Sequence, residues 1–331
     1  MDRIYTTNLK AIACIFIFLH HYYTQSEGCV QVFGFWMVSV FFLLSAYGLT
    51  KSLISREICF LDYCKKRLVK VLVPYLLVNV IVILLCRGRI PVFNSAQPVA
   101  CFMENSNILD ILYYAFGIKM MDGVMWFVNT ILLFYVFLYF IKYFKTSLNK
   151  LLYITLVTLI YIATFIVMNK HFYSYASILC FPIGTYIALY EDRLRLLMSR
   201  LGGVKMVLFT MLWIVFILGG IYVANVHTRF FTKMVVIFAF TIINSFMCFR
   251  LSKTFLAKNV PILSWIGGIS YEFYLVHMKF ISYFHTTNLC DSFLYNPLIM
   301  ILIILLGSQI IAWLSIDNVR KLINIINAKT I

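Results

Sequence analysis

Ten long apolar segments dominate this sequence, separated by short polar stretches that are rich in lysine and arginine. A helix needs about 20 mostly apolar residues to cross roughly 30 Å of hydrocarbon, where its backbone must satisfy its own hydrogen bonds. Hydrophobic residues make up 63% of the 331, and the mean hydropathy is +0.93, more apolar surface than a soluble domain would bury. The sequence therefore predicts an all-α polytopic membrane protein. We expect spans near residues 9–25, 34–50, 69–86, 124–142, 150–168, 175–190, 205–224, 233–249, 262–284 and 297–316.

The basic residues between these spans predict the orientation. With a cytoplasmic N-terminus, 21 of the 28 lysines and arginines fall on the cytoplasmic side, which favours both termini inside. The outer side keeps Arg87, Arg89, Lys119, Lys170, Arg229, Lys233 and Lys279. Topology thus explains the net charge of +16 without nucleic acid. We expect residues 1–331 to form a single integral-membrane domain whose first span remains as an uncleaved anchor.

Polar residues inside the first span are the first candidates for chemistry. Lys10 lies at the inner edge, and His21 follows eleven residues later. That spacing is three helical turns, a rise of about 16 Å, and leaves both residues on nearly the same helix face. The neighbouring His20 would point about 100° away. Alternatively, Lys10 is an inner-side anchor and the two histidines belong to the outer interface beside an aromatic belt.

A basic cluster precedes the third span. It contains Lys66, Arg67 and Lys70, followed by Pro74. Arg67 and Lys70 are three residues apart and would be neighbours on one α-helical face. They are suited to clamp a polyanion such as the phosphates of a nucleotide-like donor. The alternative is a role in lipid headgroup binding and topology.

The ninth expected span is unusually polar. Glu272 and His277 lie within it, accompanied by the hydroxyls of Ser270, Tyr271 and Tyr274. Ionisable residues at membrane depth are costly and usually face a cavity or a partner. Being five residues apart, Glu272 and His277 would lie about 140° apart around one helix. We expect His277 to support the geometry of a site and Glu272 to pair with a cation.

Six motifs in order give the sequence a recognisable pattern. They are Asn8-Leu9-Lys10-Ala11-Ile12-Ala13 with His21, Phe41-Phe42-Leu43-Leu44-Ser45-Ala46-Tyr47-Gly48, Arg67 and Lys70 before Pro74, Trp126-Phe127, Phe181-Pro182-Ile183-Gly184, and Ser270-Tyr271 with Tyr274-Leu275 and His277. Over nearly its whole length the chain resembles the membrane-bound acyltransferase-three family, which includes bacterial surface-polysaccharide O-acetyltransferases. It departs from the family where Lys10 and Lys70 replace arginine, which keeps the charge and loses the bidentate fork. Ala11 and Ala46 also stand where glycine is usual.

The resemblance implies a membrane O-acyltransferase. An acyl group, most simply acetyl, would pass from cytosolic acetyl-CoA, a co-substrate rather than a permanently bound cofactor, to a hydroxyl of a surface or lipid-linked polysaccharide. His21, Lys10, His277 and Glu272 would form the catalytic site. Arg67, Lys70, Lys66 and Lys10 would bind the acyl-CoA, and no metal is required.

The resemblance places the chain in a cell membrane, the bacterial inner or plasma membrane, as a multi-pass protein in contact with lipid. It leaves open the acceptor sugar, acetyl against succinyl, and a homo-oligomer. Two other functions remain open from the sequence. One is a transporter or flippase for lipid-linked saccharides. The other is a non-catalytic subunit of a polysaccharide export complex, which the two lysine replacements would suit.

Overall fold

The computed structural model divides the chain into two compact units. The first comprises Met1–Cys59 and Leu133–Gly267, and the second comprises Phe60–Leu132 and Gly268–Ile331. Each is therefore assembled from two separate stretches of sequence. The structure describes residues 1–26, 31–86, 91–93, 100–102, 107–200, 203–225, 230–286, 290 and 292–317.

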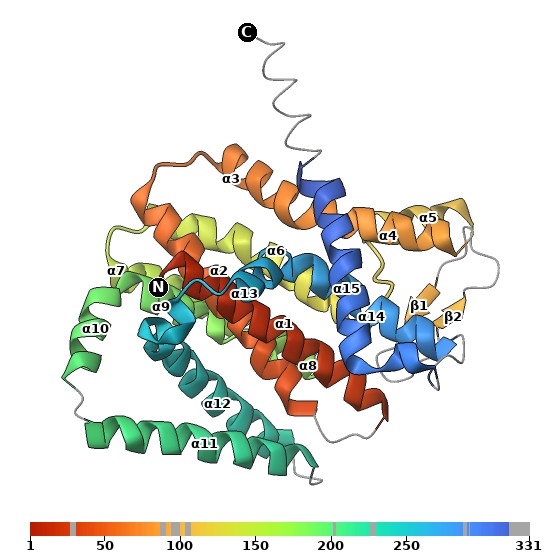
Figure 1. The fold of residues 1–331 in the computed structure, drawn as a ribbon. Coiled ribbons are helices and arrows are strands. Elements are labelled where there is room, and N and C mark those ends of the chain that lie inside the picture. Colours follow the sequence, from red (N-terminus) through yellow and green to blue (C-terminus); the bar gives the residue numbers. More distant parts are fainter. Residues whose placement is uncertain are drawn as a thin grey trace. The chain divides into compact units, whose positions relative to one another are not determined.

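Helices make up the first unit (Figure 1). Its α-helices are α1 (Arg3–Ser26), α2 (Gln31–Ser55), α7 (Ser147–Val167), α8 (Tyr173–Ala176), α9 (Cys180–Leu189), α10 (Glu191–Ser199), α11 (Gly203–Asn225), α12 (Phe230–Arg250) and α13 (Pro261–Gly268). Short 3₁₀ turns occupy Phe140–Tyr143, Leu251–Lys253 and Phe255–Ala257. The helix α6 (Trp126–Tyr139) begins in the second unit and ends in the first.

The core of the first unit lies where α2 packs against α1 and α9. Gly184 explains how α9 approaches so closely, because a Cβ at this position would lie 2.4 Å from the carbonyl oxygen of Leu43 and 3.0 Å from the Ala46 Cβ. The rings of Phe42 and Phe181 meet edge to face beside this contact. Gly184 thus allows the expected motif on α9 to pack directly against the expected motif on α2.

The second unit is also helical, with one small hairpin. It contains α3 (Phe60–Arg67), a π-helical turn (Leu68–Leu72), α4 (Val73–Leu85), α5 (Ile108–Ala115), α14 (Ser270–Thr286) and α15 (Pro297–Ala312). Shorter turns lie at Gly123–Met125, Phe293–Tyr295 and Trp313–Asp317. The strands β1 (Pro91–Phe93) and β2 (Ala100–Phe102) pair antiparallel, with Val92 opposite Cys101. The sequence pattern did not predict this hairpin.

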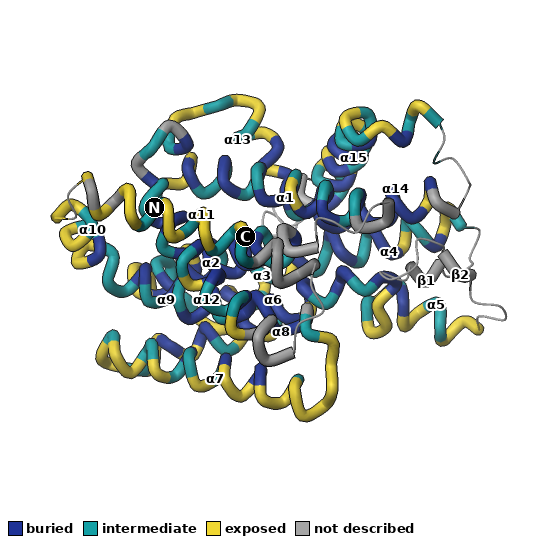
Figure 2. Tube along the Cα trace, turned by 90° about the horizontal axis from the view of Figure 1, so that it is seen from below, coloured by how far each residue is buried: buried dark blue, intermediate teal, exposed yellow. Residues whose placement is uncertain are grey.

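Several helices carry exposed residues along their length, as Figure 2 shows for α7, and many of the exposed residues are large and apolar. On α15, Leu298, Leu302, Leu306 and Ile310 recur every four residues and are all more than half exposed. The opposite face of the same helix, including Ile304, is buried. Similar exposed faces occur on α7 and α11. Exposing an apolar surface of this kind to water is energetically unfavourable, whereas exposing it to lipid is not. The structure therefore supports a membrane protein.

Five helices in the described part of the chain are long and apolar enough to cross a membrane. They are Gly34–Ser55, Phe60–Leu85, Gly123–Tyr143, Ser147–Val167 and Pro297–Ser315. Three further expected spans correspond to the shorter apolar helices Ser174–Leu189, Val207–Gly219 and Val235–Arg250. The helical membrane class is thereby confirmed, while the count of ten spans and the cytoplasmic termini stay predictions.

The ninth expected span, residues 262–284, is not one continuous helix. It consists of α13, ending at Gly268, and α14, beginning at Ser270. Two consecutive glycines precede the interruption, and glycine carries a high entropic cost in a helix. Glu272 therefore lies in the first turn of a new helix rather than in the middle of a long one.

Candidate active site

Helix α1 carries Lys10 and His21 in the first unit. It is α-helical without interruption from Arg3 to Ser26, so the helical spacing that places both residues on nearly the same face applies. The two side chains are half-buried. Eleven residues of α-helix separate them by a rise of about 16 Å, so they lie along one face without touching. Their catalytic roles stay predictions.

His20 has a different environment from His21. It is buried, and its imidazole lies against Gly34 of α2, where a Cβ would come within 2.3 Å of the ring. The rings of His20 and His21 meet edge to face with centroids 4.8 Å apart. Packing thus fixes His20, whereas His21 keeps partial exposure. This difference agrees with choosing His21 over His20 as the candidate base.

The N-terminal end of α1 is anchored by Asn8, the first residue of its motif. The Asn8 side-chain amide donates to the carbonyl oxygens of Leu256 and Lys258, both at 2.9 Å. The side chain is fully buried, so an unpaired amide there would carry a desolvation cost. These two bonds tie the turn before Lys10 to the segment that precedes α13.

A carboxylate that no sequence motif had indicated joins α2 to α10. Glu191 accepts hydrogen bonds from the Tyr47 hydroxyl at 2.7 Å, the Lys51 ammonium at 2.9 Å and the Arg195 guanidinium at 2.7 Å, and the Met1 ammonium lies 2.7 Å away. Burial raises the pKa of the Glu191 carboxyl, but these donors outweigh it and hold the pKa well below its usual range. Glu191 therefore stays ionised and fixes Tyr47, which belongs to the motif on α2.

In the second unit the basic cluster lies at a break in helical geometry. Arg67 ends α3, and Lys70 lies within the π-helical turn that follows. Pro74 accounts for this turn, because proline has no N–H to donate to the Lys70 carbonyl and its ring clashes with that carbonyl in a regular α-helix. The backbone N–H of Val73 donates instead to the Leu68 carbonyl, five residues back.

The π-helical turn changes how the basic side chains are arranged. Arg67 and Lys70 were expected to be α-helical neighbours, but a wider turn sets them further apart around the axis. Arg67 is half-buried, and its guanidinium lies over the Tyr63 ring at 5.7 Å from the centroid. Lys66 and Lys70 are exposed. Two exposed ammonium groups beside a held guanidinium can bind an anion, and the acyl-CoA assignment stays a prediction.

Helix α14 contacts this basic segment directly. The Tyr271 hydroxyl donates to the Val71 carbonyl at 2.7 Å. Val71 lies within the π-helical turn. Tyr271 thus joins the sixth motif to the third.

Tyr274 joins α14 to the Trp126-Phe127 motif. Its hydroxyl donates to the Val124 carbonyl, and its ring meets Phe127 edge to face with centroids 5.1 Å apart. The same residue orients His277, because His277 Nδ1 lies 2.6 Å from the Tyr274 carbonyl oxygen. A carbonyl can only accept, so Nδ1 carries the proton and Nε2 is the basic nitrogen of the neutral ring.

A buried ion pair lies next to this group. The Lys279 ammonium lies 2.8 Å from Asp122, with side-chain exposures of 7% and 1%. Asp122 also accepts from the backbone N–H groups of Val124 and Met125 and so caps the entry to α6. Lys279 was counted among the outer-side cations, and the structure places it within α14, where it is buried. An aspartate ahead of an apolar helical run was the available signal for the cap.

Glu272 does not show the ion pair that was expected of it. The residue is 2% exposed, and among the described residues no lysine or arginine nitrogen lies within 4.0 Å of its carboxylate. Its place in the first turn of α14 provides a reason, since free backbone N–H groups and the helix dipole favour an acidic side chain there. A role in catalysis stays a prediction for Glu272 and for His277.

The structure thus brings the six motifs together in two groups of three. The first unit holds the α1 motif and the mutually packed motifs of α2 and α9. The second holds the basic segment, Trp126-Phe127 and the α14 signature, joined through Tyr271 and Tyr274. Within the described ranges no group of three or more His, Cys, Asp and Glu side chains could hold a metal ion.

These features define a class first: an α-helical membrane protein with ionisable residues held inside apolar helices. The sequence model of the acyltransferase-3 family, described as an acyltransferase domain, matches residues 3–317. The chain belongs to this family, which confirms the resemblance and implies membrane acyltransferase activity. No curated protein and no solved structure that was compared matches it.

Proposed function

We propose that the protein transfers an acyl group, most simply acetyl, from cytosolic acyl-CoA to a hydroxyl of a surface or lipid-linked polysaccharide. One observation carries the proposal: the family match over residues 3–317, in a chain that keeps Lys10 and His21 on one uninterrupted helix. The family accounts for acyl transfer, and the helix offers a cation and a base at different depths.

The dimensions of α1 support transfer across the membrane. The rise from Lys10 to His21 is about 16 Å, close to the roughly 15–20 Å that an extended pantetheine arm spans by chain geometry. A coenzyme whose phosphates stay near the inner face would thus bring its thioester to the depth of His21. The basic residues Lys66, Arg67 and Lys70 are the proposed partners of those phosphates.

His21 is the proposed general base. A neutral imidazole takes the proton of the acceptor hydroxyl as the hydroxyl oxygen attacks the thioester carbonyl. The C–S bond then breaks, an ester forms, and coenzyme A leaves as the thiol or thiolate. The alternative route passes the acyl group through the His21 ring, and both routes need this side chain. His277 supports the geometry of the site.

Labelled acetyl-CoA tests this proposal. Purified protein in lipid vesicles is given radiolabelled acetyl-CoA and a polysaccharide acceptor, and the label is followed onto the glycan or the protein. We expect label on the glycan. A flippase would move lipid-linked saccharide without acetyl-CoA, and a non-catalytic subunit would yield no label while still binding its complex. Either result would contradict the proposed acyl transfer.

A further inference from the structure

Helix α10 connects two apolar helices of the first unit (Figure 1). It begins at Glu191, directly after the end of α9, and α11 follows from Gly203. The apolar helices on either side, Ser174–Leu189 and Val207–Gly219, correspond to two of the expected spans. A short connection between consecutive spans lies where the membrane meets water, so this topology places α10 at the membrane surface.

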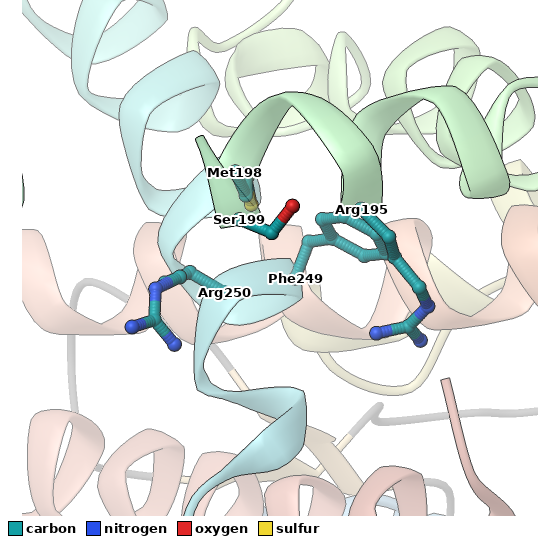
Figure 3. A pocket seen from close by; sticks show the side chains of 5 residues that line it. All are labelled: Arg195, Met198, Ser199, Phe249 and Arg250. Atoms are coloured by element: carbon teal, nitrogen blue, oxygen red, sulfur yellow. The ribbon is translucent and has the colours of Figure 1, made fainter. Parts of the chain in front are cut away.

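One face of α10 is fixed against the rest of the first unit. It carries Glu191, Leu194, Arg195 and Met198, whose spacing of three and four residues places them on one side of a helix. Leu194 is buried, and Glu191 bonds to α2 as described above. Arg195 is held by Glu191 and lies over the Phe249 ring, 5.0 Å from its centroid. Figure 3 shows that Arg195 and Met198 line a small pocket together with Phe249 of α12. These contacts determine which face of α10 points away from the first unit.

The opposite face of α10 is formed by Arg193, Leu196, Leu197 and Arg200, which we call the outer stripe. At about 100° per residue, its centre lies roughly 180° from the centre of the fixed face. Leu196 is 54% exposed and Leu197 is 58% exposed, and both arginines are exposed as well. The Arg200 backbone N–H donates to the Leu196 carbonyl at 3.3 Å, so the helical spacing extends to Arg200. Two exposed leucines thus lie between two exposed arginines.

The outer stripe combines apolar surface with positive charge. Over the described ranges, no carboxylate lies within 4.0 Å of the guanidinium of Arg193 or Arg200. Asp192, the exposed acidic residue of α10, lies about 90° away around the helix. A soluble anion would neutralise the arginines but leave the two leucines in water. A membrane surface with anionic headgroups suits both, because leucines enter the acyl boundary while arginine side chains extend to the phosphates.

We infer that the outer stripe of α10 docks on anionic phospholipids, which in the predicted orientation are those of the inner leaflet. Arg193 and Arg200 lie seven residues apart, about 10 Å along the helix axis, so each contacts a headgroup of its own. An arginine near an anionic surface contributes roughly a fivefold preference for that surface, and two contribute about thirtyfold. The inference rests on the membrane class of the protein and is independent of the proposed acyl transfer.

Native mass spectrometry of the full chain in neutral detergent tests the charge preference. The protein is titrated with phosphatidylglycerol, which is anionic, or with phosphatidylcholine, which is not, and the bound lipids are counted. We expect the wild type to prefer phosphatidylglycerol, and Arg193→Gln combined with Arg200→Gln to lower its affinity for this lipid about thirtyfold. The matched control is Arg56→Gln with Lys145→Gln, which removes two exposed cations from the same predicted side but outside the outer stripe. The control should bind phosphatidylglycerol as the wild type does.

Leu196→Asn combined with Leu197→Asn tests the apolar part of the outer stripe. Both positions are exposed, so the fixed face of α10 keeps its contacts. This variant retains both arginines and should still lose phosphatidylglycerol affinity at least tenfold, because the leucines no longer enter the acyl boundary. The inference is overturned if the arginine variant binds phosphatidylglycerol as tightly as the control, or if the leucine variant loses no affinity. A wild-type dimer that the leucine variant dissociates would also overturn it, because the outer stripe would then join two copies of the chain.

Discussion

Breaking the buried ion pair between Asp122 and Lys279 should destabilise the second unit strongly. Both side chains are almost fully enclosed, and their charged atoms lie 2.8 Å apart. Removing one partner of such a pair typically costs about 3–5 kcal/mol, because the other charge stays buried without compensation. Asp122 also caps the turn leading into α6, which adds about 1 kcal/mol when the side-chain oxygen is lost.

Two substitutions at Asp122 separate these contributions. Asparagine keeps a capping oxygen and removes the charge, so Asp122→Asn should lower the free energy of unfolding by about 3 kcal/mol. Asp122→Ala removes both functions and should cost about 1 kcal/mol more than the asparagine variant. The double variant Asp122→Asn with Lys279→Met leaves no buried charge and should return to within about 1 kcal/mol of the wild type.

The measurement is reversible unfolding in mixed micelles of increasing dodecyl sulfate fraction, followed by circular dichroism. Asp110→Asn is the matched control, because the ion pair of Asp110 with Lys119 is of similar length, 2.9 Å, but its side chains are 21% and 47% exposed. Exposed pairs contribute about 0–1 kcal/mol, so this variant should barely move the transition. The reasoning is refuted if Asp122→Asn costs no more than Asp110→Asn, or if Lys279→Met fails to rescue it.

Three further predictions concern affinity, catalysis and acid stability. Arg67→Ala should weaken acyl-CoA affinity about ten- to a hundredfold with little effect on the acceptor, measured by ligand-dependent thermal stabilisation; unaltered acyl-CoA affinity would indicate a topological role. His277→Ala should reduce turnover more than Glu272→Gln, and wild-type turnover in the double variant would exclude both from the site. The folded pKa of Glu191 lies below its unfolded value of about 4.3, so its stabilisation is full above that value and is lost as the pH falls further. In acid titrations of unfolding, Glu191→Gln should lack this loss, and an unchanged acid slope would contradict the ion network.

The sequence predicted those parts of the fold that depend on apolar periodicity. It identified a helical membrane protein, and α1 is helical throughout the region where Lys10 and His21 were expected to share a face. Apolar length determines where a helix forms almost independently of its neighbours. The family resemblance then assigned roles to the candidate residues. Periodicity alone left several alternative roles open for each of them.

The rest depended on contacts that a linear pattern does not contain. Pro74 is visible in the sequence, yet the π-helical turn ahead of it also accepts a hydrogen bond from the Tyr271 hydroxyl, two hundred residues away along the chain. The sequence shows the charge of Lys279, which was counted as a topology signal, but it does not show that this charge pairs with Asp122. A polar residue in an apolar helix indicates that a partner is needed, but only the packing of the helices shows which partner it has.

The central claim is that His21 carries the acyl transfer, and a matched pair of histidine variants tests it most directly. His21→Ala and His20→Ala are purified, shown to unfold at temperatures close to the wild type, and assayed for label passing from acetyl-CoA to polysaccharide. We expect His21→Ala to lose transfer while still binding acyl-CoA, and His20→Ala to retain most of the transfer activity. Near-normal transfer by His21→Ala, with loss in His20→Ala, would contradict the proposed role of His21.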